Sequence, residues 1–294
     1  MLYPVRPMRF GAASKPKNQH AQETVYYIGG PTASGKTALS VALAKRIPDA
    51  VFINADTMQL YHGLGKLAAS PSDEELAGMD HRLFGVLGLA EDCSRSQWLA
   101  MATREIDQLL KAGKTPVLVG GSRSFLAELA RAAYGVYLPV DQDNAVTFSD
   151  ETVSLKRAFP YQLKTIILMP QASAMSEGIG RWVRSVTRSM DHVAQLADAQ
   201  QEADGPAFWA FAYQELKPVL SGECSLLSAL HQLKDKTMNY AREQMALYNR
   251  LYEAVCRSAQ PDRVIRIEST DAGQRVDQAL RFMNAEEKEK PISD

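Results

Sequence analysis

The stretch TVYYIGGPTASGKT at residues 24–37 decides the fold. Its first five residues, Thr24–Ile28, are β-branched or aromatic, which is typical of a buried strand. Residues Gly30 to Thr37 match the phosphate-binding pattern G-x4-G-K-[ST] in full. In the segment ALSVALAKRI that follows, apolar residues recur at helical spacing. A P-loop requires this order of strand, glycine-rich turn and helix, so the sequence predicts a bound di- or triphosphate held with Mg²⁺.

Each part of this loop has an expected role. The glycines allow a tight turn that points successive N–H groups at phosphate oxygens, and the following helix adds its positive dipole end. Lys36 can bridge terminal phosphate oxygens, and the hydroxyl of Thr37 can bind Mg²⁺. The predicted diphosphate-binding residues are Gly30, Pro31, Thr32, Ala33, Ser34, Gly35, Lys36 and Thr37.

Strand and helix patterns alternate beyond the loop. Further strands are expected at Ala50–Asn54, Lys114–Gly120 and Leu163–Met169, and helices at Ser96–Ala112 and Ser124–Ala133. This alternation predicts an α/β fold with a P-loop NTPase-like, mostly parallel sheet flanked by helices. After Ser176 helical patterns dominate, at Gly178–Ala197, Gly205–Leu220, Ser225–Ser258 and Ala272–Met283, with a candidate last strand at Val264–Ile267.

These patterns divide the chain into four parts. We expect a disordered basic leader at 1–22 and a P-loop α/β core at 23–175, within which 136–159 is a reduced insertion. A helical region at 176–285 follows, its last strand joining the core, and then a charged tail at 286–294. The leader has four basic and no acidic residues, so a short transit peptide is the alternative interpretation.

Composition limits the partners and the compartment. The formal net charge of the 294 residues is −1, so a nucleic-acid partner would need a local basic patch. The three cysteines fit no zinc or CxxC spacing, which favours reduced thiols in a cytoplasmic protein. No apolar run approaches the roughly 20 residues that a membrane span needs. We expect a monomer without a membrane partner.

Two more segments belong at the carboxyl edge of the sheet, where open α/β sheets bind ligands. Residues 54–61 (NADTMQLY) follow the second strand, and Gly120-Gly121-Ser122 follow the strand at Lys114–Gly120. Asp56, beside the P-loop, could be a magnesium ligand as in kinases, a base that takes a proton, or a helix cap. The residues alone leave these three roles open.

Together these segments resemble the tRNA dimethylallyltransferase (tRNA isopentenyltransferase) family. The family's GPTASGKT loop is identical here, its I-S-A-D-S-x-Q-x-Y motif is similar to residues 53–61, and its LLVGGTGLY motif is similar to residues 118–125. Its GYKEL and T-R-x-Y-A-K-R-Q signatures are similar to residues 212–216 and 237–244. The order and spacing hold from about Tyr26 to Leu251.

The resemblance implies transfer of a dimethylallyl group from its diphosphate to N6 of adenosine-37, beside the tRNA anticodon. The P-loop would then hold a leaving diphosphate, whose charge Lys36, Thr37 and Mg²⁺ stabilise. Asp56 would accept the N6 proton, and the hydroxyl of Ser122, where the family has Thr, would touch the reacting centre. The tRNA-contacting positions implied by the motif are Asp56, Thr57, Met58 and Gln59.

The chain departs from the family in several places, which identifies a divergent, shortened member. Residues 65–71 replace the D-I-G-T-A-K-P loop and lose its Thr and Lys. An arginine expected about twenty residues beyond the GGT motif has no counterpart in 140–153, although Lys156 or Arg157 could substitute. The helical insertion with the D-R-Q-R-[IV]-x-R-A motif, which grips the anticodon stem, is absent. Residues 246–249 replace the T-W-F-R motif.

Other features leave the acceptor open. Arg181, Arg184 and Arg188 are spaced i, i+3 and i+7, so they predict a basic helical stripe that either contacts RNA phosphates or is a solvated face. Tyrosines 213, 240 and 248 could stack on bases but are favoured as core residues. The alternatives to the tRNA enzyme are an isopentenyltransferase for free adenine nucleotides, a degenerate non-catalytic paralogue and a small-molecule P-loop kinase.

Overall fold

The computed structural model describes residues 23–72, 74–76, 78–140 and 159–284. The expected leader at 1–22, the tail at 286–294, and most of the reduced insertion, with Lys156 and Arg157, lie outside the described residues. In the part that is described, no helix combines the length and apolar content needed to cross a bilayer.

The core is a six-stranded sheet in the order β3-β2-β4-β1-β5-β6, and all its strand pairs are parallel. The strands are β1 (Thr24–Gly29), β2 (Ala50–Asn54), β3 (His81–Arg82), β4 (Thr115–Gly120), β5 (Gln162–Leu168) and β6 (Val264–Ile267). This confirms the predicted α/β class. Gly29 at the end of β1 is in register with Gly120 at the end of β4, so the P-loop and the Gly120–Ser122 turn leave the sheet side by side.

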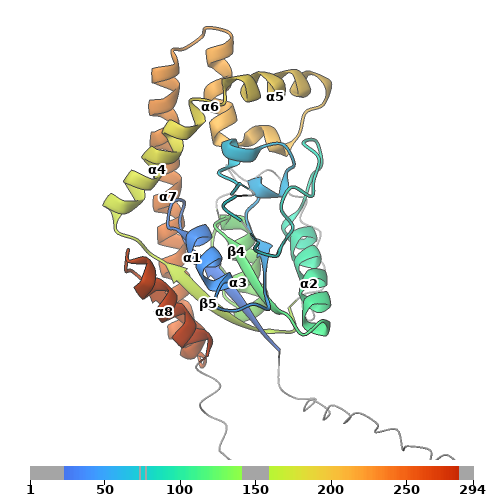
Figure 1. Cartoon of the computed structure of the whole chain (residues 1–294), viewed down its shortest axis with the longest axis vertical. Coiled ribbons are helices and arrows are strands. Elements are labelled where there is room, and N and C mark those ends of the chain that lie inside the picture. The colour runs from blue at the N-terminus through green and yellow to red at the C-terminus, as the bar shows by residue number, and fades with distance from the viewer. Residues whose placement is uncertain (1–22, 73, 77, 141–158, 285–294) are drawn as a thin grey trace, which may run out of the picture.

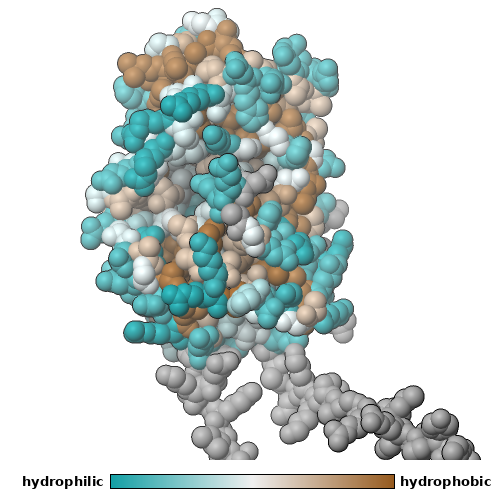
Figure 2. Space-filling model, in the orientation of Figure 1, coloured by the Kyte–Doolittle hydropathy of each residue, from teal (hydrophilic) through white to brown (hydrophobic). Residues whose placement is uncertain are grey.

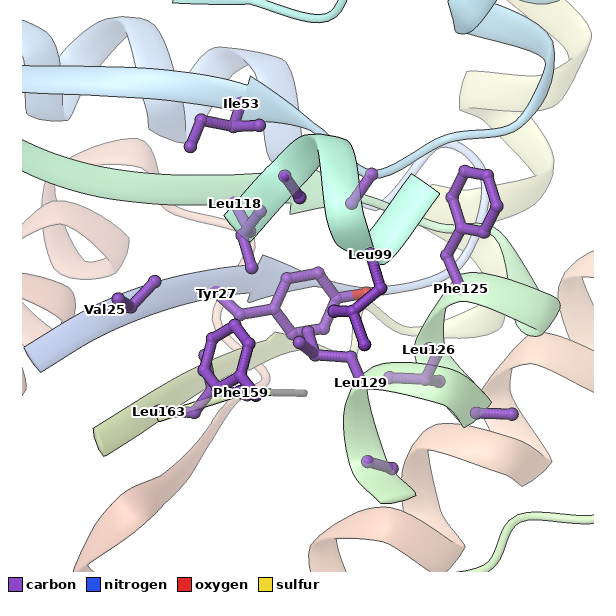
Figure 3. Close-up of a cluster of buried hydrophobic side chains, with 14 of the residues drawn as sticks. Val25, Tyr27, Ile53, Leu99, Leu118, Phe125, Leu126, Leu129, Phe159 and Leu163 are labelled. Carbon is purple, nitrogen blue, oxygen red and sulfur yellow. The ribbon is translucent and has the colours of Figure 1, made fainter. Parts of the chain in front are cut away.

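Helices cover both faces of the sheet (Figure 1). One face packs against α2 (Arg95–Lys111), α3 (Arg123–Tyr134) and the C-terminal half of α7 (Leu226–Cys256). The other packs against α1 (Lys36–Ala44) and α8 (Ala272–Met283). In the first core, Trp98 stacks on Phe125 at 4.2 Å between ring centroids. Figure 3 shows Tyr27 among the apolar side chains of this core, including Leu118 and Leu129.

A separate helical layer stands at one end of the sheet (Figure 1). It consists of α4 (Ala172–Val186), α5 (Met190–Glu202), α6 (Phe211–Leu220) and the N-terminal half of α7. Short 3₁₀ helices join it at Met58–Leu60, Gly65–Ala68 and Pro206–Trp209, and another, Pro261–Arg263, precedes β6. The layer has its own core, which includes Phe208, Tyr213 and Leu233. Figure 2 shows apolar surface at its tip, near the exposed Leu220 and Leu227.

Two of the predicted helices are wrong in extent. The helix expected at Gly178–Ala197 is two helices, because α4 ends at Val186 and α5 begins at Met190. This break lets apolar residues on either side of it enter one core. The helix expected from Gly205 begins only at Phe211, since Pro206 starts a separate 3₁₀ turn. The two-residue strand β3 was not predicted, and its shortness explains why alternation gave no signal.

Candidate active site

The P-loop forms the centre of the site at the carboxyl end of β1. Gly30 has φ 153°, and a Cβ there would lie 2.6 Å from the carbonyl oxygen of Leu168 and 2.8 Å from Ser34 Oγ. The loop therefore needs glycine at this position to fold tightly against β5. Gly35, with φ 90°, precedes the first helical residue, Lys36. The backbone thus turns into the N-terminus of α1 as an anion cradle requires.

Lys36 is folded back onto the loop that precedes it. Its Nζ donates to the carbonyl oxygens of Gly30 and Pro31, both at 2.9 Å. Burial lowers the pKa of Lys36 to about 8, although the Asp56 carboxylate opposes this shift. Ser34 Oγ, 1% exposed, has no hydrogen-bond partner among the described residues. A bound anion would satisfy both groups, because Lys36 donates its hydrogen bonds to neutral carbonyl oxygens and the Ser34 hydroxyl is unpaired.

Asp56 lies directly beyond β2 and is braced by Asn54. The Asp56 N–H donates to Asn54 Oδ1 at 2.8 Å, and Asn54 Nδ2 donates to the Asp56 carbonyl oxygen at 2.9 Å. Asp56 Oδ1 accepts the N–H of Met58 at 3.3 Å, so the carboxylate also has a local capping contact. Burial raises the pKa of Asp56, with Lys36 opposing it. A fixed carboxylate with a raised pKa suits a proton acceptor.

Ser122 joins the Asp56 segment to the turn after β4. Its Oγ lies 2.6 Å from Thr57 Oγ1 and 3.0 Å from Ser124 Oγ, and it caps the N-terminus of α3. The side chain is buried. This chain of hydroxyls fixes the spacing between the two segments that follow β2 and β4.

Helix α7 ties the P-loop to the turn after β4 through Gln244 and Tyr248. Gln244 Oε1 accepts from Thr32 N at 2.8 Å and Thr32 Oγ1 at 3.1 Å, while its Nε2 donates to the Gly121 carbonyl oxygen at 2.5 Å. Tyr248 OH donates to the Gly120 carbonyl oxygen at 3.1 Å. Sequence reasoning assigned these two residues no such role, although Gln244 is the last letter of the T-R-x-Y-A-K-R-Q signature.

Arg275 of α8 is a third residue whose role the sequence did not reveal. Its Nη1 donates to the Ser34 carbonyl oxygen at 3.0 Å, and its Nε donates to the Ser269 carbonyl oxygen at 2.5 Å. Burial lowers the pKa of Arg275. The contact joins residues 241 positions apart, and no motif in α8 marks it.

A cavity of about 1650 Å³ joins these elements to the helical layer. It is larger than the roughly 300–1,000 Å³ of a usual small-molecule pocket, so it has room for more than one ligand. One wall is aromatic, and there the rings of Phe211 and Tyr240 meet edge to face at 5.4 Å. The cavity's lining includes Lys36, Thr37, Asp56, Ser122, the aromatic residues Trp182, Trp209, Phe211 and Tyr240, and the basic residues Lys45, Arg46, Arg123, Arg181 and Lys236.

The structure brings most of the predicted site residues to this cavity. Six residues of the P-loop, Thr32 to Thr37, line it together with the segment Asp56–Gln59. The first two residues of the loop, Gly30 and Pro31, are not part of the lining; their carbonyl oxygens accept hydrogen bonds from Lys36. Tyr240 borders the cavity, whereas tyrosines 213 and 248 are core residues.

The predicted basic stripe is wrong as a single helical face. Arg181 and Arg184 lie on α4, but Arg188 lies beyond its end at Val186. Arg181 lines the cavity, while Arg184 and Arg188 are exposed and are not part of its lining. The helical spacing failed because nothing in this segment marks the break between α4 and α5.

Comparisons with known proteins agree on one family. The family model described as IPP transferase matches residues 59–146 and 136–250. A tRNA dimethylallyltransferase from Caulobacter sp. (strain K31) is 29% identical over 276 residues, which cover 76% of this chain and 89% of the relative. One from Streptomyces griseus is 30% identical and covers 77% of this chain and 87% of the relative.

The fold has a counterpart among solved structures. The full-length tRNA isopentenylpyrophosphate transferase from Bacillus halodurans aligns with a TM-score of 0.71. The alignment covers 90% of this chain and 96% of that chain, at 23% sequence identity. At this identity the likeness concerns the fold, including the helical layer above the sheet.

Proposed function

Because the chain belongs to the IPP transferase family, we propose that it is a prenyl transferase that moves a dimethylallyl group from dimethylallyl diphosphate to N6 of adenosine-37 in tRNA, releasing diphosphate. One observation carries this proposal: a single cavity joins an anion-binding P-loop, a fixed carboxylate and an aromatic wall. These are the parts needed to hold the leaving group, accept a proton and receive a base together with an allyl chain.

The diphosphate end of the cavity is built from the P-loop. The backbone N–H groups at the start of α1 and the Ser34 hydroxyl would bind its oxygens, and Lys36 would exchange its two carbonyl partners for the anion. Arg275 holds the outer side of the loop through the Ser34 carbonyl oxygen. Binding energy at the P-loop can therefore orient the allylic carbon toward Asp56.

The donor set also fits Mg²⁺ bound together with the diphosphate. In the described part of the chain, no three His, Cys, Asp or Glu side chains cluster as a metal cage. Thr37 lines a small cavity beside Lys36, and its hydroxyl is the oxygen donor that the P-loop pattern assigns to Mg²⁺. Mg²⁺ usually has only one or two protein ligands, and substrate phosphates and water complete its coordination. When bound, Mg²⁺ would neutralise charge developing on the leaving diphosphate.

The proposed site residues account for each bond and proton in the transfer. The N6 amine attacks the allylic carbon, and the carbon–oxygen bond to diphosphate breaks with its electron pair leaving on the diphosphate. The N6 proton passes to the Asp56 carboxylate, whose burial raises its proton affinity. Asp56 then returns this proton to water. The hydroxyls of Thr57 and Ser122 lie beside this centre and would orient the amine.

Charge and aromatic area on the far wall suit an RNA acceptor. Arg123, Arg181 and Lys236 line the cavity, together with Tyr240 and Phe211. Cationic and aromatic side chains are the usual partners of phosphate groups and unstacked bases in RNA recognition. An anticodon-loop acceptor agrees with the cytoplasmic location expected from the sequence, and the monomeric state stays a prediction.

Product analysis tests the proposal. The full chain is incubated with dimethylallyl diphosphate, Mg²⁺ and one of three acceptors: an anticodon stem-loop with adenosine-37, the same RNA with guanosine-37, or AMP. Mass spectrometry of the digested nucleosides should show dimethylallyl-adenosine only with the first RNA. Product on AMP alone would establish the free-nucleotide enzyme. If no acceptor gives product, phosphate transfer in a parallel incubation with ATP would establish a kinase, and diphosphate binding by calorimetry without any transfer would establish a non-catalytic paralogue.

A further inference from the structure

Arg123 differs from the other cations of the cavity wall in how its side chain is held. It is the first residue of α3, directly after Ser122, and its side chain is only 14% exposed. Its Nη1 lies 2.6 Å from Oε2 of Glu243 on α7, and its guanidinium lies 5.0 Å from the ring centroid of Tyr240. The side chain is therefore held in one place by an ion pair and a cation–π contact.

The position is unfavourable for a cation from the standpoint of α3. The N-terminus of a helix carries partial positive charge, so an arginine in the first turn is repelled, and the first turn of α3 has no acidic residue. Because no residue of α3 offsets this unfavourable charge, we expect the role of Arg123 to lie in contacts outside α3. Among the described residues, Arg123 forms its ion pair with Glu243, which comes from another helix.

Two departures from the family motifs meet in this contact. Aligned with LLVGGTGLY, Arg123 stands where the motif has glycine. Aligned with T-R-x-Y-A-K-R-Q, Glu243 stands where the motif has arginine. The ion pair therefore places a cation on α3 beside the α7 position at which the motif has its arginine. Paired changes of this kind are expected where a charge is needed at a fixed point in space.

We propose that Arg123 is the RNA-contacting cation at this point and binds a phosphate of the acceptor's anticodon loop. The inference rests on the proposed tRNA acceptor. Arg123 lines the cavity and its partner Glu243 is 53% exposed, so the pair lies between the cavity and the surface, where a polynucleotide backbone can reach. Arginine has five N–H donors, and Glu243 occupies only part of this fork. The diphosphate, by contrast, has its own donors in the P-loop and Lys36.

The test compares Arg123→Gly with the exchange variant Arg123→Gly/Glu243→Arg, which restores the motif arrangement. Arg123→Gly should weaken binding of the adenosine-37 stem-loop about tenfold and reduce the slope of log K against log salt by about 1. Diphosphate affinity should stay within about twofold of wild type, and the exchange variant should recover most of the RNA affinity. Arg257→Gly, which removes an equal charge from an exposed pair at the end of α7, is the matched control and should bind RNA as wild type does.

Wild-type RNA affinity and salt slope in Arg123→Gly would overturn the inference, and so would an equal loss of diphosphate affinity or an exchange variant without recovery. If Arg123→Gly does not fold, Arg123→Gln keeps the stem and removes the charge. The two proposals fail separately. Binding that depends on Arg123 without product would refute only the transferase, and product formation indifferent to Arg123 would refute only this contact.

Discussion

Replacing Gln244 by leucine should break the hydrogen bonds that join the P-loop to the turn after β4. The Gln244 amide satisfies the N–H and hydroxyl of Thr32 and the carbonyl oxygen of Gly121, at distances between 2.5 and 3.1 Å. Leucine has similar bulk but neither donor nor acceptor. Gln244→Leu therefore removes three hydrogen bonds without opening a large cavity, and it leaves three polar groups of the site unpaired.

The expected cost follows from how these groups are buried. An unpaired buried polar group costs about 1–3 kcal/mol. The Gly121 carbonyl oxygen, in a buried residue, would bear the full cost, whereas the half-exposed Thr32 can recover part of its loss from water. We expect a loss of about 3 kcal/mol in the free energy of unfolding, measured by urea denaturation. Diphosphate affinity, measured by calorimetry, should fall about tenfold because the loop is no longer held in its binding conformation.

Gln232 provides the matched control on the same helix. It is exposed, and its amide makes only a 3.5 Å contact with Ser228 Oγ one turn earlier. Gln232→Leu should change the free energy of unfolding by no more than about 0.5 kcal/mol. The reasoning is refuted if Gln244→Leu is as stable as Gln232→Leu, or if it loses stability while its diphosphate affinity is unchanged.

Four further changes test the site. Asp56→Asn should lower the rate of transfer by about 10²–10⁴ while diphosphate affinity is not weakened, and near-normal turnover would exclude Asp56 as the base. The titration of Lys36 should add no pH dependence to diphosphate affinity below its pKa of about 8. Above this pH the affinity should fall by up to about tenfold per pH unit, because binding must then take up a proton. Lys36→Arg measured with the same ligand should remove this part of the pH dependence, and an identical profile in both proteins would contradict it. Tyr248→Phe should cost about 1–3 kcal/mol of unfolding free energy, since the hydroxyl contacts both the Gly120 carbonyl oxygen and the Tyr27 hydroxyl; a variant as stable as wild type in urea denaturation would contradict this. Gly120→Ala should prevent stable folding, because its Cβ would lie 2.0 Å from the Ala55 carbonyl oxygen, and a variant with wild-type circular dichroism and melting temperature would contradict this geometry.

The sequence predicted the parts of the site that follow strands directly. A P-loop after β1, Asp56 after β2 and Ser122 after β4 each lie within a few residues of a strand end, so parallel pairing alone brings them together. The last strand, β6, was predicted at the residues that form it. Local pattern and sheet geometry suffice for such elements because each depends on neighbouring residues.

Contacts made by distant helices could not be predicted in the same way. Gln244 and Arg275 reach the P-loop from α7 and α8, and the register of those helices on the sheet decides which side chain arrives there. Helical periodicity says which face is buried but not what lies opposite it. The prediction that Arg188 shares a helical face with Arg181 and Arg184 was wrong for the same reason. The end of α4 is set by packing in the helical layer and not by a capping signal.

The same distinction explains where a divergent chain can change. The groups proposed to bind the diphosphate are backbone N–H groups and side chains of one short loop, so they cannot be exchanged singly without losing the loop. The cations proposed to face the acceptor come from different helices, and any helix that reaches the same point on the wall can supply one. The proposed role of Arg123 is an example, because its guanidinium reaches Glu243 of α7 from α3. If that role holds, two departures from single motifs leave one cation available to the acceptor.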